Sequence, residues 1–221
     1  LLSSDSGDDF MPAWSPDGRE LAYYGFRQGR RRLFVMPIDG GASGPVARDS
    51  GNQRYPGWAP DGKHLVFHSD RSGRFELYVV ARDPAGRWSS PRQLTTEGGQ
   101  DARWSPDGSS IVYLRDARLW VIPADGGVPR PLVSAGDSLP RPLLAQWAPD
   151  GRTIYYKAQD AHGATSLWAV AAAGGEPREV VRFDDPLRTS SRAEFATDGR
   201  HLFFTASERE SDIWRMELEP R

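Results

Sequence analysis

The chain of 221 residues contains no cysteine, which excludes disulfide bonds, thiolate metal sites and a cysteine nucleophile. Histidine is scarce as well, and the four histidines are too scattered to predict a metal site. There is no run of about 18 apolar residues, so we expect no membrane-spanning helix. The formal net charge is −2, which gives no electrostatic reason to expect a nucleic acid as partner.

What the chain does have is a repeated phrase: an aromatic residue followed by Ser or Ala, then Pro, Asp and Gly. The five copies are Trp14–Gly18, Trp58–Gly62, Trp104–Gly108, Trp147–Gly151 and Phe195–Gly199, the last with Thr in place of Pro. Their aspartates stand 44, 46, 43 and 48 residues apart, a spacing typical of four-stranded propeller blades. The sequence therefore predicts an all-β propeller of five four-stranded blades, forming a single domain over residues 1–221.

Each repeat can be divided into turns and strands. The phrase predicts a tight turn, because Pro suits the second turn position and Gly the position that needs a positive φ. An apolar strand such as Leu21–Tyr24 follows, and after a polar turn a second one such as Leu33–Met36. A short proline-containing segment such as Pro45–Ala47 is typical of an edge strand. We expect the aromatic residue that opens each phrase to lie in the core between blades.

The two ends of the chain complement each other in this scheme. The fifth repeat ends at Ile213–Leu218 without a fourth strand, and Leu1–Ser3 precedes the first phrase, where a fourth strand belongs. We therefore expect the N-terminal segment to complete the last blade and close the ring. Five blades of a larger ring are the alternative.

The repeated phrase, the turn Ser69–Arg74, strands of the Leu-Tyr/Trp-Val type and the Asp-Gly-Gly corner resemble the WD-like repeats of the TolB propeller family. The resemblance covers nearly the whole chain. It implies a toroid that binds proteins or peptides, in the periplasm or another extracytoplasmic space. TolB itself usually has six blades, and the five repeats depart from that number. Similar repeats also occur in propellers attached to hydrolases, kinases and transcription regulators.

Motifs of catalysis or metal binding are weak. Gly136–Leu139 spells the nucleophile motif of GDSL-type hydrolases, but it lies in a loop between repeats and has no α/β sheet around it. The acidic stretch Asp5–Asp9 resembles half of a calcium loop and is interpreted as a solvated turn. We therefore expect no catalytic residue, no metal and no cofactor.

The candidate site lies where the first strand of each blade begins. The residues three and four positions before each opening aromatic differ from blade to blade, while the repeat around them stays regular. Up-and-down strand order places these positions at the mouth of the channel, where their apolar members form a patch that a partner covers. The predicted ligand-binding residues are Phe10, Met11, Arg54, Tyr55, Gln100, Asp101, Leu143, Leu144 and Arg192, with Ser191 beside the last.

Several arginines follow the turns between second and third strands. They are Arg27, Arg30, Arg31, Arg32, Arg71, Arg74, Arg115 and Arg118. One interpretation is that they are polar hairpin tips. The other is an arginine-lined sector that binds a carboxylate or phosphate.

Together these patterns favour a non-catalytic scaffold that recognises a protein or peptide at the channel mouth. We expect it to be monomeric, without nucleic-acid binding or membrane insertion. The first alternative is an accessory or gating propeller of a larger hydrolase, kinase or sensor chain. The second is a stand-alone lyase or hydrolase.

Overall fold

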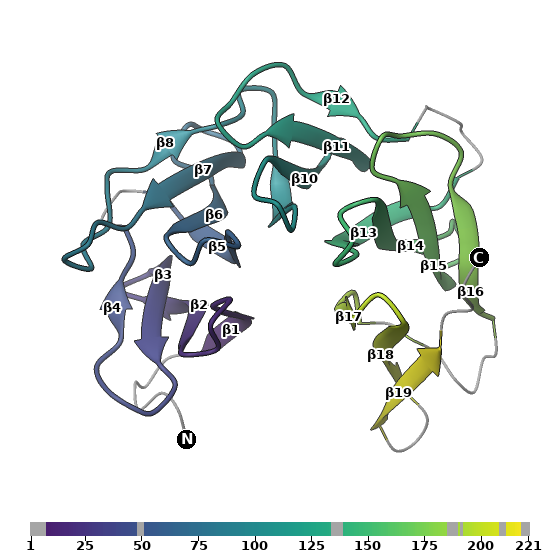
Figure 1. Ribbon diagram of the computed structural model, residues 1–221, viewed down its shortest axis with the longest axis horizontal. Helices are drawn as coiled ribbons and strands as arrows, with labels where there is room; N and C mark the ends of the chain where they lie inside the picture. Colours follow the sequence, from purple (N-terminus) through teal and green to yellow (C-terminus); the bar gives the residue numbers. More distant parts are fainter. Residues whose placement is uncertain are drawn as a thin grey trace. The chain divides into compact units, whose positions relative to one another are not determined.

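The computed structural model describes residues 8–47, 51–133, 139–184, 190, 192–207 and 211–217. Regular structure in these ranges consists of β-strands (Figure 1). The first sheet contains β1 (Asp9–Trp14), β2 (Glu20–Arg27), β3 (Arg30–Pro37) and β4 (Gly44–Pro45); the second contains β5 (Gln53–Trp58), β6 (His64–Ser69), β7 (Glu76–Ala81) and β8 (Arg92–Gln93).

The remaining sheets repeat this order. The third contains β9 (Gln100–Trp104), β10 (Ser110–Arg115), β11 (Arg118–Pro123) and β12 (Arg130–Pro131); the fourth contains β13 (Arg141–Trp147), β14 (Thr153–Gln159), β15 (Thr165–Ala171) and β16 (Arg178–Phe183). The fifth consists of β17 (Phe195–Thr197), β18 (His201–Ser207) and β19 (Ser211–Glu217). Consecutive strands pair antiparallel, as in β2 with β3 and β14 with β15. The predicted all-β fold with five blades is confirmed.

Two parts of the fold prediction stay predictions. Residues Leu1–Ser3, expected to complete the last blade, lie outside the described residues, so closure of the ring is untested. The single domain expected over residues 1–221 is the second part that stays a prediction. By its contacts the chain divides into two compact units, unit 1 with Leu1–Tyr113 and Pro123–Gly127, and unit 2 with Leu114–Ile122 and Val128–Arg221. We describe each unit by itself.

The repeated phrase forms the expected turn. The turn glycines have φ values between 64° and 88° and are Gly18, Gly62, Gly108, Gly151 and Gly199. In the first copy, the N–H of Gly18 donates a hydrogen bond to the carbonyl of Ser15 over 2.9 Å. The expected positive φ is therefore confirmed in all five copies, and glycine adopts it without the steric cost of a Cβ atom.

One buried cluster of unit 1 lies between the first and second blades. Leu33 and Val35 of β3 share a buried cluster with Leu65 and Phe67 of β6. β5 also packs against β1 and β2 of the preceding blade and against β9 of the next. In unit 2 a second cluster joins the fourth and fifth blades through residues such as Leu167 and Leu202.

The prediction that every opening aromatic lies in the core is wrong for Trp14, which is 58% exposed. Trp58, in contrast, is 9% exposed, and its indole N–H donates to the carbonyl of Ala13, in the first strand of the preceding blade. Trp58 is thus covered by the blade before its own.

The outer strands β4, β8 and β12 have two residues each, fewer than expected. In the first blade, side chains of the second blade complete the hydrogen bonding of the edge. The N–H of Leu33 donates to Oε1 of Gln53 over 2.9 Å, and the N–H of Arg31 donates to Oδ1 of Asn52 over 3.1 Å. Gln53 is fully buried. These bonds satisfy the free edge of β3 and join the two blades.

Candidate functional site

The first strands of the first three blades share an unusual backbone conformation. Met11, Tyr55 and Asp101 have φ values of 52°, 53° and 53°. All three stand three positions before the opening aromatic of their blade. Left-handed conformations are rare and strained for residues other than glycine, and such strain is concentrated at functional sites. In β1 and β5 the pairing register shifts at this point, so a bulge reorients the side chains.

Next to these bulges lies a row of rings from the first two blades. Phe10 stacks on Tyr24 with ring centroids 5.4 Å apart, and Tyr24 lies 5.9 Å from Tyr55. Tyr55 stacks on His68 at 5.3 Å, and His68 meets Phe75 edge-on at 4.9 Å. Phe10 is 43% exposed, while His68 is 3% exposed. The row therefore leads from the surface into the core.

Arg54 is the charged residue of this region with the least internal bonding. Its guanidinium carbon lies 4.9 Å from the centre of the Phe75 ring. Within the described ranges it donates no hydrogen bond and forms no ion pair, and its Nε is buried without an acceptor. A buried donor without a partner is costly and is expected only where a ligand or water supplies the acceptor.

His68 is a neutral member of the row. The backbone N–H of Asp101 donates to its Nδ1 over 3.2 Å, so the neutral ring carries its proton on Nε2. Burial, together with the positive charges of Arg54 and Arg103, lowers the pKa of His68 to about 3, whereas the negative charge of Asp70 opposes the shift. The ring thus stays uncharged at neutral pH.

We call this set the Arg54 cluster. It consists of Phe10, Met11, Tyr24, Arg54, Tyr55, His68, Phe75 and Asp101, all in unit 1. Five of these residues were predicted from the sequence. Tyr24, His68 and Phe75 were not, although Tyr24 and His68 share the repeat position ten residues after the opening aromatic. The sixth predicted residue of unit 1, Gln100, is exposed at the start of β9.

The predicted residues of unit 2 have different surroundings. Leu143 is half-buried and Arg192 is exposed, but Leu144 is 2% exposed. The expected exposed patch is therefore wrong at Leu144. The pairing register in β13 shifts between Pro142 and Leu144, and Leu144 lies opposite Lys157 in the interior of its blade. Ser191 lies outside the described residues, and the grouping of all the predicted residues at one mouth stays a prediction.

Lys157 is a buried lysine that sequence reasoning missed. Its Nζ donates to Oγ of Ser190 over 2.5 Å and to the carbonyl of Arg192, and it lies 5.2 Å from the ring centre of Phe183. Burial lowers the pKa of Lys157 to about 8, while the negative charge of Glu194 opposes the shift. Lys157 occupies the same repeat position as Tyr24 and His68 and anchors the backbone of Arg192.

Three of the arginines near the hairpins are engaged within the fold. Arg27 pairs with Asp9 at 2.8 Å, and Arg74 pairs with Glu76 at 2.7 Å. Arg71 lies over the ring of Tyr78 with its guanidinium carbon 4.1 Å from the centroid. These contacts favour the structural interpretation over the anion-binding sector.

The histidines His64 and His201 stabilise turns. The Nδ1 of His64 lies 2.6 Å from Oδ2 of Asp61, and the corresponding distance from His201 to Asp198 is 2.8 Å.

Among the described residues, no group of three or more His, Asp or Glu side chains is placed to hold a metal ion. The GDSL-like serine and the first half of the acidic stretch, residues 138 and 5–7, fall outside these ranges. No helix in the described ranges is long and apolar enough to cross a membrane.

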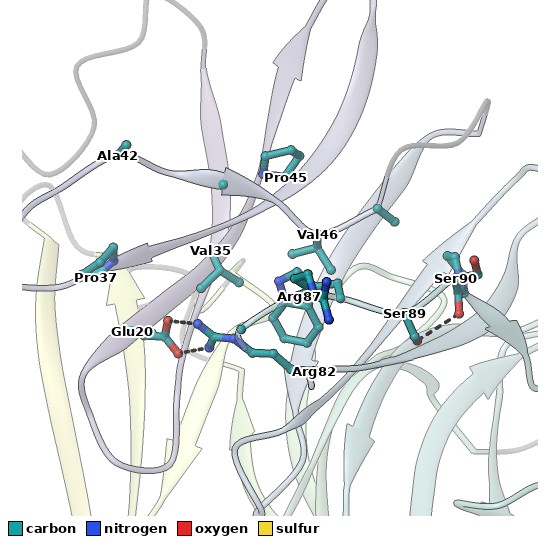
Figure 2. A pocket seen from close by; sticks show the side chains of 15 residues that line it. Glu20, Val35, Pro37, Ala42, Pro45, Val46, Arg82, Arg87, Ser89 and Ser90 are labelled. Atoms are coloured by element: carbon teal, nitrogen blue, oxygen red, sulfur yellow. Dashed lines mark hydrogen bonds and ion pairs between the residues drawn. The ribbon is translucent and has the colours of Figure 1, made fainter. Parts of the chain in front are cut away.

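A groove of about 710 Å³ lies between the outer parts of the first two blades in unit 1 (Figure 2). We call it the rim groove. Its lining comes from β2, β3, the segment around β4, and residues 82–91 between β7 and β8. Glu20 accepts two hydrogen bonds from Arg82, of 2.5 and 2.9 Å. Arg82 also lies over the ring of Trp88 at 5.4 Å. The charged groups at the base of the groove therefore satisfy each other.

Comparisons with known proteins agree with this architecture. A family model described as TolB beta propeller domain matches residues 1–122. The uncharacterized peptidase YuxL of Bacillus subtilis (strain 168) is 36% identical over 59 residues, which are 24% of this chain and 8% of that protein.

Two solved structures extend the likeness over nearly the whole chain. TolB from Acinetobacter baumannii has a TM-score of 0.76 at 19% identity, covering 98% of this chain and 53% of that one. A puromycin-hydrolyzing peptidase of Mycobacterium tuberculosis has a TM-score of 0.67 at 18% identity, covering 96% and 36%. The chain therefore spans about half the length of that TolB and a smaller part of the peptidases. At such identities the likeness shows the fold alone.

Proposed function

The chain belongs to the TolB β-propeller domain family, and from this premise we propose that it is a non-catalytic scaffold that binds a protein or peptide at the Arg54 cluster. The observation that carries the proposal is Arg54 itself, a half-buried guanidinium that has no hydrogen-bond or ion-pair partner within the described ranges. Phe10, at the other end of the row of rings, is exposed. Aromatic and arginine side chains dominate the binding energy of many protein interfaces. The strained backbone at Met11, Tyr55 and Asp101 supports the same location for the binding site.

Three further properties belong to this proposal. The WD-like blades form a closed ring in which the N-terminal segment completes the fifth blade. Leu143 and Arg192 of unit 2 also contribute to ligand binding. The protein acts as a monomer, without a cofactor, outside the cytoplasm.

The test uses peptides selected from a displayed library on the purified protein, with affinities measured by calorimetry. The double variant Arg54→Gln with Phe10→Ala should weaken binding by about 100-fold, because it removes the charge and the exposed ring. These positions are better suited than Tyr55, which packs against the core and whose loss disturbs the fold.

The matched control is Arg87→Gln in the rim groove, where Arg87 pairs with Asp83 at the surface. This variant should keep full affinity. Peptides that bind the double variant as well as the unchanged protein, or that lose affinity in the control, would contradict the proposal.

A second function is favoured by the names of two relatives, both peptidases of which this chain covers only a part. In that case the propeller is an accessory domain that controls access of peptides to a catalytic domain elsewhere in a longer chain. The same double variant, made in that longer chain, would then change KM for long peptides and leave kcat for a dipeptide substrate unchanged.

A further inference from the structure

The chemistry around Arg54 restricts what the proposed binding site recognises. We propose that the Arg54 cluster binds a carboxylate group of its ligand through the guanidinium of Arg54. This inference rests on the proposed function and adds the chemical class of the ligand. The carboxylate belongs either to the C-terminus of a peptide or to an acidic side chain.

The first step of the argument is the state of the guanidinium. Only Nε of Arg54 is buried without an acceptor, while its terminal nitrogens reach the surface and also have no partner in the described ranges. Arginine presents its donors in a planar fork that matches the two oxygens of a carboxylate. A carboxylate placed on this fork supplies the missing acceptors.

The second step is the orientation of the fork. The guanidinium lies over the ring of Phe75, which is itself packed against His68. This stacking restricts the side chain of Arg54 before a ligand arrives. Less conformational entropy is therefore lost when the ligand binds.

The third step concerns the other charges near the fork, which are Arg103, Asp70 and Asp101. Both carboxylate oxygens of Asp70 accept hydrogen bonds from Asn52, over 2.7 and 2.8 Å. Neither Asp70 nor Asp101 forms an ion pair with Arg54 among the described contacts. The two arginines also oppose protonation of the buried His68. An anionic ligand therefore meets a fork that no internal carboxylate occupies.

The experiment compares two probes that differ in one group, N-acetyl-phenylalanine with its carboxylate and N-acetyl-phenylalaninamide without it. Binding at pH 7.5 is followed by NMR, using the imidazole signals of His68 as the local reporter. The carboxylate probe should bind about tenfold more tightly than the amide, as expected when a charged hydrogen-bond acceptor is added. Arg54→Gln should remove the difference, and Arg54→Lys should restore only part of it because lysine lacks the fork.

Arg87→Gln is the matched control, since Arg87 is 81% exposed and lies in the rim groove; it should leave both affinities unchanged. Equal binding of the two probes, a difference that survives Arg54→Gln, or no carboxylate-dependent shift at millimolar probe would overturn the inference. If library peptides still require Arg54 and Phe10 while the probes bind equally, only the carboxylate assignment fails. If neither peptides nor probes require these residues, the proposed function fails as well.

Selected peptides identify the source of the carboxylate. Peptides that lose affinity on C-terminal amidation present the main-chain carboxylate. Those that lose affinity only when Asp or Glu is replaced by Asn or Gln present a side chain. Peptides that tolerate both changes together would overturn the inference.

Discussion

The Arg54 cluster and the rim groove each contain an arginine stacked on an aromatic ring, yet the two arginines differ in what they can still bind. Arg82 gives two hydrogen bonds to Glu20 and lies over Trp88. Arg54 lies over Phe75 and gives none within the described ranges. The groove has a volume of about 710 Å³, but its charges are already paired. The comparison teaches that unsatisfied donors, rather than volume, indicate where a polar ligand binds.

The backbone shows the same contrast. The Arg54 cluster contains three residues other than glycine in the left-handed region, whereas among the residues lining the groove only Gly86 has a positive φ. A strained backbone persists only where the surrounding structure holds it in place. We infer that the groove joins two blades and that the cluster presents side chains to a partner.

The largest expected effect is a loss of stability on acidification. It should come from His68 of the Arg54 cluster and not from the rim groove. The pKa of His68 falls from 6.5 in the unfolded chain to about 3 in the folded protein. Between these values the unfolded chain binds a proton that the folded protein does not. The free energy of unfolding should therefore fall as the pH drops below 6.5, by up to about 1.4 kcal/mol per pH unit.

The check is urea unfolding between pH 7 and 5, a range in which the aspartates and glutamates of ordinary pKa stay ionised. His68→Asn should flatten the profile, because asparagine keeps an acceptor near Asp101 without titrating. His162→Asn, at an exposed loop position, serves as control and should change little. A profile with the same slope in the His68 variant would contradict the buried neutral histidine.

Removal of Arg82 should produce the next largest effect and test whether the groove is structural. Arg82→Gln leaves the part-buried carboxylate of Glu20 without its partner and loses the stacking on Trp88, so stability should fall by about 1–2 kcal/mol. The double variant Glu20→Gln with Arg82→Gln should recover part of this loss. Chemical denaturation measures both, and an unchanged midpoint in the single variant would mean that the ion pair does not join the blades.

Glycine and alanine substitutions at matched positions should give the smallest effect and sharpen the contrast in backbone strain. At Met11, where φ is 52°, the glycine variant should be more stable than the alanine variant by about 1 kcal/mol. At Val35, a strand residue lining the groove, the order should reverse by about 0.5–1 kcal/mol. Thermal unfolding of the four variants decides this, and the same order at both positions would rule out strain at Met11.

The sequence was sufficient for the blades because their signals are local. Proline, aspartate and glycine in the repeated phrase specify a hairpin within five residues, and all five turn glycines have the expected φ. The apolar strands around each turn then follow from their composition. The repeat also identified the divergent positions of Arg54 and Tyr55.

The remaining features depend on contacts between blades, which no single repeat contains. The exposure of Trp14 depends on whether a blade covers it, and the burial of Leu144 depends on where the bulge of β13 falls. The sequence around Lys157 does not predict its burial, because its partners Ser190 and Arg192 come from the segment before the next blade. Only the folded arrangement shows that Arg54 has no hydrogen-bond or ion-pair partner among the residues that the structure describes.

The most direct test of the account compares Arg54→Gln with Arg82→Gln, measuring for each variant both the free energy of unfolding and the affinity for one selected peptide. We predict that Arg54→Gln keeps stability within about 0.5 kcal/mol and loses binding. Arg82→Gln should lose stability and, while folded, keep the affinity of the unchanged protein. If Arg82→Gln abolished binding while folded and Arg54→Gln bound normally, the recognition site would be the rim groove and the central claim would be wrong.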